Sequence, residues 1–87
     1  MNTLIENIRI TKAMYIADYR IKFEFSDGTT KEVDFYPYLS KPGQNPMVNQ
    51  YLDKNRFQKF DILKNRDISW DDYEMCFSLE TIYTGVF

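Results

Sequence analysis

The sequence predicts a single α+β domain over residues 1–87, built on a mainly antiparallel sheet. This sheet has an N-terminal three-stranded meander plus C-terminal short strands, and it is accompanied by one short helix and a final helical turn. Three observations predict the arrangement: the alternating apolar residues over 19–25, the Asp27-Gly28 turn that follows, and the helix start at Asn45-Pro46.

The central hairpin gives the strongest of these signals. Odd positions from Tyr19 to Phe25 are apolar and even positions are polar, which is typical of a strand with one buried face. We expect Asp27-Gly28 to reverse the chain, with Gly28 at positive φ, because glycine adopts that conformation without a steric penalty. Residues 29–35 then form the return strand.

A first strand over residues 8–16 completes the predicted meander. Its apolar residues occupy even positions, namely Ile8, Ile10, Met14 and Ile16. Lys12 interrupts this apolar face, which indicates a bulge or a position near the edge of the sheet.

A loop and a helix follow the meander. Pro37 ends the third strand because proline cannot donate to a sheet, and residues 40–46 are rich in proline and glycine. Asn45 is a good N-cap with Pro46 at the first helical position, and we expect this helix to end near residues 54–55.

Short strands and a helical turn complete the prediction. Residues 57–63 form a fourth strand, residues 68–70 a fifth, and residues 73–75 return across a turn. Ser78 caps the final helical turn, and Gly85 ends it.

Composition limits the partners and the compartment that we expect for this protein. Eleven Lys and Arg against thirteen Asp and Glu give a net charge of −2, so nothing attracts the whole chain to nucleic acid or an anionic membrane. The single cysteine, Cys76, excludes an internal disulfide and suits a reducing compartment. The first residues lack the apolar run of a signal peptide, and we expect a cytoplasmic protein.

The sequence offers little catalytic chemistry. It contains no histidine, and Cys76 has no basic neighbour, so we expect a buried structural thiol. Asp71, Asp72 and Glu74 are the best candidates for a metal or acid–base site, but aspartate is also favoured in a turn. We favour the turn, and we expect no metal, cofactor or catalytic residue.

Two surfaces are candidates for binding. One is a basic strip that could contact phosphates, although interspersed aspartates favour ordinary solvated charge; it consists of Lys54, Arg56, Lys59, Lys64 and Arg66. The other is aromatic and apolar, and it consists of Tyr36, Tyr38, Tyr51, Tyr83, Val86 and Phe87. Tyrosines beside the Pro-rich loop could line a groove, and the apolar tail could complete an interface. Trp70 could anchor an interface, but we expect it in the core beside Ile68.

Several short motifs resemble those of the domain of unknown function 2442 family, small bacterial α+β domains. They are FSDG at residues 25–28, VDF at 33–35, YLD at 51–53, ISW at 68–70 and SLETIY at 78–83. The resemblance implies no catalytic residue set. It implies a module that works through a partner, since members stand alone, beside genes in what look like toxin–antitoxin pairs, or fused to DNA-binding helix-turn-helix domains.

We therefore expect a non-catalytic protein-interaction domain, which binds another protein, such as a neighbouring-gene product, or a second copy of itself as a homodimer. The alternatives are a nucleic-acid-associated regulatory protein that uses the basic strip, and an enzyme with an unrecognised carboxylate-based site. We do not expect nucleic acid or a membrane as the main partner.

Overall fold

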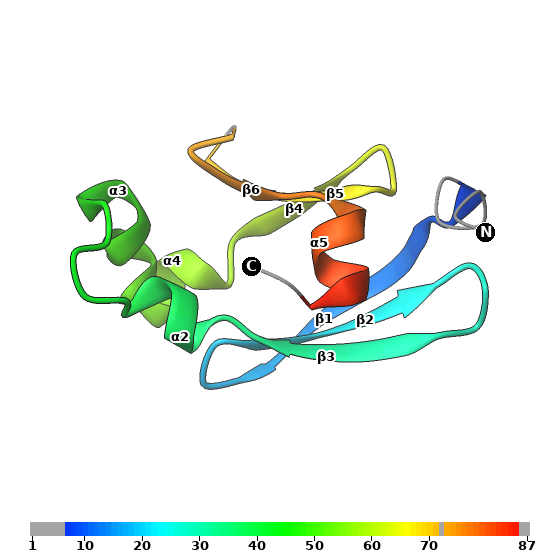
Figure 1. Ribbon diagram of the computed structural model, residues 1–87, viewed down its shortest axis with the longest axis horizontal. Coiled ribbons are helices and arrows are strands. Elements are labelled where there is room, and N and C mark those ends of the chain that lie inside the picture. The colour runs from blue at the N-terminus through cyan, green and yellow to red at the C-terminus, as the bar shows by residue number, and fades with distance from the viewer. Residues whose placement is uncertain (1–6, 72, 86–87) are drawn as a thin grey trace.

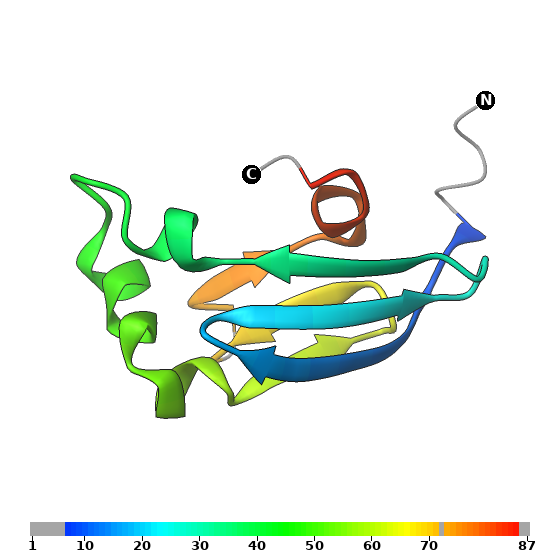
Figure 2. The ribbon, with the colours of Figure 1, turned by 90° about the horizontal axis from the view of Figure 1, so that it is seen from below.

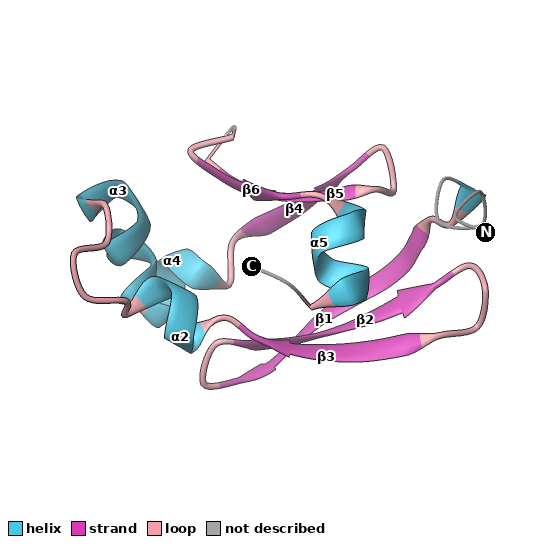
Figure 3. Cartoon of the chain, in the orientation of Figure 1, coloured by secondary structure: helices cyan, strands magenta, loops and turns pink. Residues whose placement is uncertain are grey.

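The alternating residues of the N-terminal half form the first sheet in the computed structural model, which describes residues 7–71 and 73–85. Its strands are β1 (Ile10–Ala17), β2 (Arg20–Phe25) and β3 (Thr30–Asp34), which are antiparallel and lie in the order β1-β2-β3. Ile21, Phe23 and Phe25 are buried, as the alternation predicts. The predicted meander is therefore confirmed (Figures 1 and 3).

The turn at the tip of the central hairpin is also confirmed. The amide of Gly28 donates to the carbonyl of Phe25 over 3.0 Å, and the amide of Phe25 donates to the carbonyl of Thr29 over 2.9 Å. Gly28 has φ of 88° and Asp27 Oδ1 accepts from the amide of Thr29. This is a three-residue hairpin loop with glycine at its left-handed position.

The face of β1 differs from the sequence prediction. Its pairing with β2 shifts between Ile10 and Lys12, so the bulge inferred at Lys12 is present. Because one extra residue inverts the alternation, the side chains of Met14 and Ile16 are 40% and 41% exposed on the outer face. The prediction that Met14 and Ile16 share the buried face of Ile10 was wrong.

Short helices connect the two sheets at one end of the molecule (Figure 1). They are α2 (Tyr36–Leu39), α3 (Pro46–Asn49), the 3₁₀ turn η1 (Gln50–Leu52) and α4 (Lys54–Phe57). The side chain of Asn45 accepts from the amide of Met47, so the predicted helix start is confirmed. The expected single helix is instead interrupted, because Asp53 is extended (ψ 113°) and caps α4 through its side chain.

The C-terminal half forms the second sheet, with strands β4 (Phe60–Leu63), β5 (Asp67–Trp70) and β6 (Met75–Phe77) in sequential antiparallel order. Two strand boundaries differ from the sequence prediction. Residues 54–57 are helical, which delays the fourth strand, and the turn after Trp70 keeps β6 from starting before Met75. Ser78 caps α5 (Leu79–Thr84), and Gly85 ends it with φ of 76°, as predicted.

The two sheets face each other and enclose an aromatic core (Figure 2). Trp70 is fully buried, as predicted, and its ring lies 5.4 Å from that of Phe57 and 5.9 Å from that of Phe35. Its indole N–H donates to the carbonyl of Phe57 over 2.7 Å. This bond satisfies a carbonyl at the end of α4 that has no partner within the helix.

The sandwich is closed differently on its two sides. On the β1 side, the amide of Ile10 donates to the carbonyl of Asn65 over 2.6 Å, and the Asn65 side chain returns a bond to the carbonyl of Ile10. On the opposite side, α5 covers the opening and contacts β3 (Figure 2). The outer edge of β3 therefore lies beside a helix and has no neighbouring strand in the described residues.

Candidate interaction site

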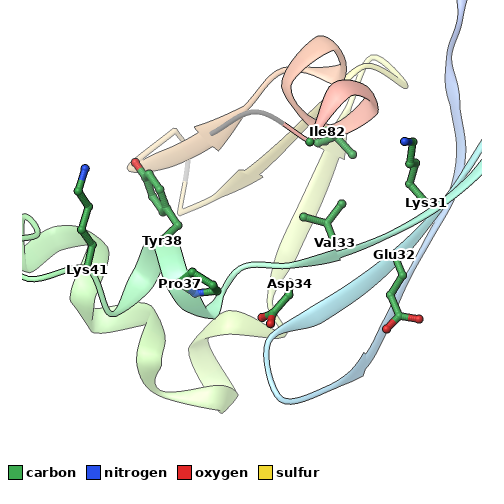
Figure 4. Close-up of a pocket in the computed structure, with 9 residues that line it drawn as sticks. Lys31, Glu32, Val33, Asp34, Pro37, Tyr38, Lys41 and Ile82 are labelled. Atoms are coloured by element: carbon green, nitrogen blue, oxygen red, sulfur yellow. The ribbon is translucent and has the colours of Figure 1, made fainter.

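An open groove of about 500 Å³ runs beside the outer edge of β3 (Figure 4). Residues of β3, α2 and α5 line it, together with two loop residues; they are Lys31, Glu32, Val33, Asp34, Pro37, Tyr38, Lys41, Ile82 and Gly85. The groove forms because Pro37 turns the chain out of the sheet into α2, while α5 packs against β3. We call this feature the β3 groove.

The backbone of β3 alternates between two hydrogen-bonding directions. The bonds from Phe25 to Thr29 and from Phe35 to Tyr19 place odd-numbered residues of the strand in hydrogen-bonded pairs with β2. The even-numbered residues Thr30, Glu32 and Asp34 therefore direct their N–H and C=O groups away from β2. Pairing between β2 and β3 shows no irregularity, so these groups form a regular row along the groove.

The charged side chains of the groove differ in whether they have a partner. Glu32 forms an ion pair of 3.5 Å with Arg20, and Asp34 Oδ1 accepts from the amide of Tyr36 over 2.9 Å. Within residues 7–71 and 73–85, Lys31 and Lys41 have no ion-pair partner. Asp34 also has no ion-pair partner among these residues, so the groove presents two positive charges and one negative charge that no ion pair compensates, while Lys31 and Lys41 lie at its ends.

Apolar side chains form the floor between these lysines. Val33 is 7% exposed, Ile82 is fully buried, and Tyr38 is half-buried with its ring 5.1 Å from that of Phe77. Figure 4 shows Lys31 and Lys41 at opposite ends of the groove, with Val33, Ile82 and Tyr38 between them. This arrangement is suited to a ligand that is apolar in its centre and acidic at its ends.

Only some of the predicted aromatic surface lies at this groove. Tyr38 lines it, whereas Tyr36 is exposed on the same helix and is not among the lining residues. Tyr83 is half-buried and donates to Asp27 Oδ2 over 2.6 Å, which ties α5 to the hairpin tip. Val86 and Phe87 lie outside the described residues.

Tyr51 was wrongly assigned to the surface. Its side chain is fully buried, with the ring 6.0 Å from that of Trp70. The hydroxyl donates to Asp71 Oδ2 over 2.5 Å, and burial together with this carboxylate raises the pKa of the Tyr51 hydroxyl. Tyr51 is a core residue whose hydroxyl contacts the carboxylate of Asp71.

The structure divides the basic strip into two groups at opposite ends of β4. Lys54 pairs with Asp18 at 3.0 Å, and Arg56 lies 4.0 Å from Asp53. Together with Lys59, Arg56 and Asp53 line a small polar pocket of about 380 Å³. At this end of the strip, carboxylates lie among the cations.

The other two cations of the strip lie in the turn between β4 and β5. Arg66 forms an ion pair of 2.6 Å with Glu80, and Lys64 has positive φ in the turn. The sequence strip therefore does not form one continuous positive surface.

The carboxylate and thiol candidates take other roles. Asp71 accepts from Tyr51, and Glu74 accepts from Gln50 over 3.2 Å, while Asp72 lies outside the described residues. In the described part of the chain, no three potential ligands gather into a group that could hold a metal ion. Asp71 and Glu74 lie in the turn that we favoured.

Cys76 is exposed, so the prediction of a buried thiol was wrong. Its neighbours Met75 and Phe77 point into the core, and in a strand the residue between two inward residues points outward. Partial burial and, to a lesser extent, Asp67 raise the pKa of the Cys76 thiol, which disfavours the reactive thiolate.

Sequence reasoning did not single out the two lysines of the β3 groove. One signal was available: Lys31 is the only charged residue among the odd positions of the return strand, where Val33 and Phe35 are buried. A charge on an inward-facing position near a strand end indicates an edge. No local pattern brings Lys41 or Ile82 to that edge, because helix packing places them there.

Among the described residues, no helix has the length and apolar character that crossing a membrane requires.

This geometry defines a small α+β domain in which the β3 edge of the first sheet borders a groove. The chain belongs to the DUF2442 family, proteins of unknown function, whose model matches residues 10–87. This confirms the family resemblance found in the sequence. The search of curated proteins finds no match.

The chain also resembles a solved structure, the crystal structure of a "Putative DNA Binding Protein" from Nitrosomonas europaea ATCC 19718. The two share 26% sequence identity, and their superposition has a TM-score of 0.71. The match covers 88% of this chain and 47% of the other, so this chain spans about half the length of that protein.

Proposed function

We propose that this chain is a non-catalytic protein-interaction domain in the cytoplasm, whose first partner to test is the product of a neighbouring gene. The observation that supports this most is the β3 groove, where a regular row of outward-facing backbone groups lies beside an apolar floor. Such an edge is a ready template for another chain, and an open sheet edge is a common site of peptide recognition.

A native pull-down tests the proposal. The tagged protein is purified from its own cell, captured proteins are identified, and each candidate is purified and mixed with the chain for calorimetry. We expect one partner to bind the purified chain in a saturable manner. A Tyr73→Ala variant should bind the partner as the native chain does, because Tyr73 is 55% exposed and lies outside the groove. If no captured protein binds the purified chain, the proposal fails.

A second copy of the chain is the other partner that we propose. Met14 and Ile16 place exposed apolar side chains side by side on the outer face of the edge strand β1, and Val86 and Phe87 extend an apolar C-terminal end. Light scattering at increasing concentration should show a dimer mass. A Met14→Lys/Ile16→Lys variant, and a chain that lacks Val86 and Phe87, identify the surface responsible. A monomer mass at all concentrations would reject self-association.

The likeness to a protein named for DNA binding favours a second candidate function, a nucleic-acid-associated regulatory protein. The geometry supports this less, since carboxylates pair with Lys54, Arg56 and Arg66, and the strip is divided. Fluorescence anisotropy with duplex DNA at rising salt tests it. We expect weak binding that a Lys59→Glu/Lys64→Glu variant does not change. Tight binding that this variant abolishes would favour the DNA-associated function.

A further inference from the structure

We propose that β3 adds an extended acidic–apolar peptide of a partner protein as a fourth strand of the first sheet. This inference rests on the proposed interaction function and names the class of ligand. It follows from the backbone of the edge, the side chains of the β3 groove, and the charges that a second copy of β3 would bring.

The backbone of β3 can hold a strand of about five residues. Thr30, Glu32 and Asp34 direct their peptide groups outward, and successive outward residues lie about 7 Å apart in a strand. A peptide with the same spacing satisfies each of these groups. The opposite edge, on β1, is less suitable, because its pairing shifts at two places and Lys12 lies beside one of them.

The side chains of the groove define the peptide's composition. In an added strand, alternate side chains would face α2 and α5. The central one would lie beside Val33, and those at either end would approach Lys31 and Lys41 (Figure 4). An acidic residue at each end and a branched apolar residue between them therefore complement the groove.

Charge also disfavours a second copy of β3 as the occupant. Two-fold antiparallel pairing must match even-numbered residues with even-numbered residues, because those residues carry the free backbone groups. Centring the pair on Glu32 opposes Glu32 to itself, and centring it on Lys31 opposes Lys31 to itself. Centring it on Val33 opposes Glu32 to Asp34. Like charges directly opposite one another destabilise a strand pair, so each of these registers is disfavoured.

The probe for this inference is a fluorescein-labelled peptide with the sequence acetyl-Gly-Glu-Thr-Val-Thr-Glu-Gly-amide, titrated with the intact chain in low salt. We expect saturable binding, with amide NMR shifts confined to β3, α2 and α5. Methylating those alternate backbone nitrogens of the peptide that face β3 should reduce affinity at least tenfold, because the methyl groups remove the N–H donors that pair with β3. A peptide with lysine in place of glutamate should not bind.

Two protein variants test the same contacts from the other side. Glu32→Pro removes an outward N–H that β2 does not use, and proline is tolerated at such edge positions, so the fold should persist while peptide binding is lost. Lys31→Glu/Lys41→Glu should exchange the preference, binding the lysine peptide and rejecting the glutamate peptide. Lys59→Glu, which changes an exposed lysine outside the β3 groove, is the control that should bind the glutamate peptide as the native chain does.

Three outcomes would overturn the inference. The first is peptide binding that neither variant changes, which places the peptide elsewhere. The second is no binding of the glutamate peptide at millimolar concentration, which would leave the interaction proposal intact if calorimetry has shown a purified partner. The third is a native dimer that Glu32→Pro dissociates, which would identify a second copy of β3 as the occupant.

Discussion

Removing the indole of Trp70 should destabilise the protein more than any other single truncation in the second sheet. The side chain is fully buried, and rings of Phe35, Tyr51, Phe57 and Phe77 lie within 6.1 Å of it, so the surrounding core cannot readily collapse into the space. Trp→Ala changes of this kind cost about 3–5 kcal/mol. A domain of this size has a total free energy of unfolding of roughly 4–13 kcal/mol, so Trp70→Ala should remove at least about a quarter of it and should unfold a chain at the low end of that range at room temperature.

The variant Trp70→Phe separates packing from hydrogen bonding. It keeps an aromatic ring but leaves the buried carbonyl of Phe57 without its donor, which should cost about 1–3 kcal/mol. Urea denaturation followed by far-UV circular dichroism measures both variants against the native chain. A further check is the fluorescence of the only tryptophan, which should be shifted to short wavelength and should move to that of free tryptophan in urea. Native emission like that of free tryptophan, or an unchanged urea midpoint in Trp70→Phe, would refute the reasoning.

Three other predictions concern a turn, a hydroxyl and a thiol. Gly28→Val should lower stability by about 1 kcal/mol or more through backbone strain alone, since open space surrounds the added Cβ; an unchanged thermal midpoint would contradict it. The pKa of the Tyr51 hydroxyl is raised above its ordinary value of 10.0, so the folded chain keeps the hydroxyl proton to higher pH than the unfolded chain. The contribution of this hydroxyl to the free energy of unfolding is therefore complete below pH 10 and is lost as pH rises further. The free energy of unfolding from urea denaturation between pH 9 and 11 should fall with a slope of up to about 1.4 kcal/mol per pH unit, and Tyr51→Phe should flatten the slope; equal slopes would exclude this role. Cys76 should react completely with a thiol reagent in the native state, but more slowly than in the urea-unfolded chain at the same pH; no native reaction would place it in the core.

The N-terminal meander could be predicted because its information is local. The alternation from Tyr19 to Phe25 sets the buried face, and Gly28 fixes the turn, so neither depends on distant residues. The face of β1 could not be read the same way. Its bulge was expected near Lys12, but a one-residue insertion inverts the following side chains, and Met14 and Ile16 therefore point to solvent.

The errors at Cys76 and Tyr51 have two different physical causes. Cys76 lies between apolar neighbours in sequence, but in a strand sequence neighbours occupy opposite faces. Tyr51 is buried because η1 folds over the edge of the core, where Asp71 accepts its hydroxyl hydrogen bond. That carboxylate is twenty residues away in the chain, and no local pattern indicates that it would approach.

The β3 groove also depends on tertiary packing. Its edge strand was predicted, but the walls come from α2, which was not expected, and from α5, which packs against β3 although it lies far from that strand in sequence. The helix that was predicted from Asn45 divides at Asp53, whose side chain starts α4. Local sequence therefore predicted most strands and few of the surfaces between elements.

The arrangement of the sandwich also has a consequence for folding kinetics. Each sheet is a meander of consecutive strands, so every ladder joins segments that are neighbours in sequence, and the average loop to be closed is short. Neither meander can persist alone, because each leaves one apolar face uncovered until the other docks. Folding should therefore be a fast, single-step reaction in which hairpins form transiently and docking of the two halves limits the rate. Two separate fragments divided in the loop over residues 40–45 should each be largely unstructured and should regain the native circular dichroism when they are mixed.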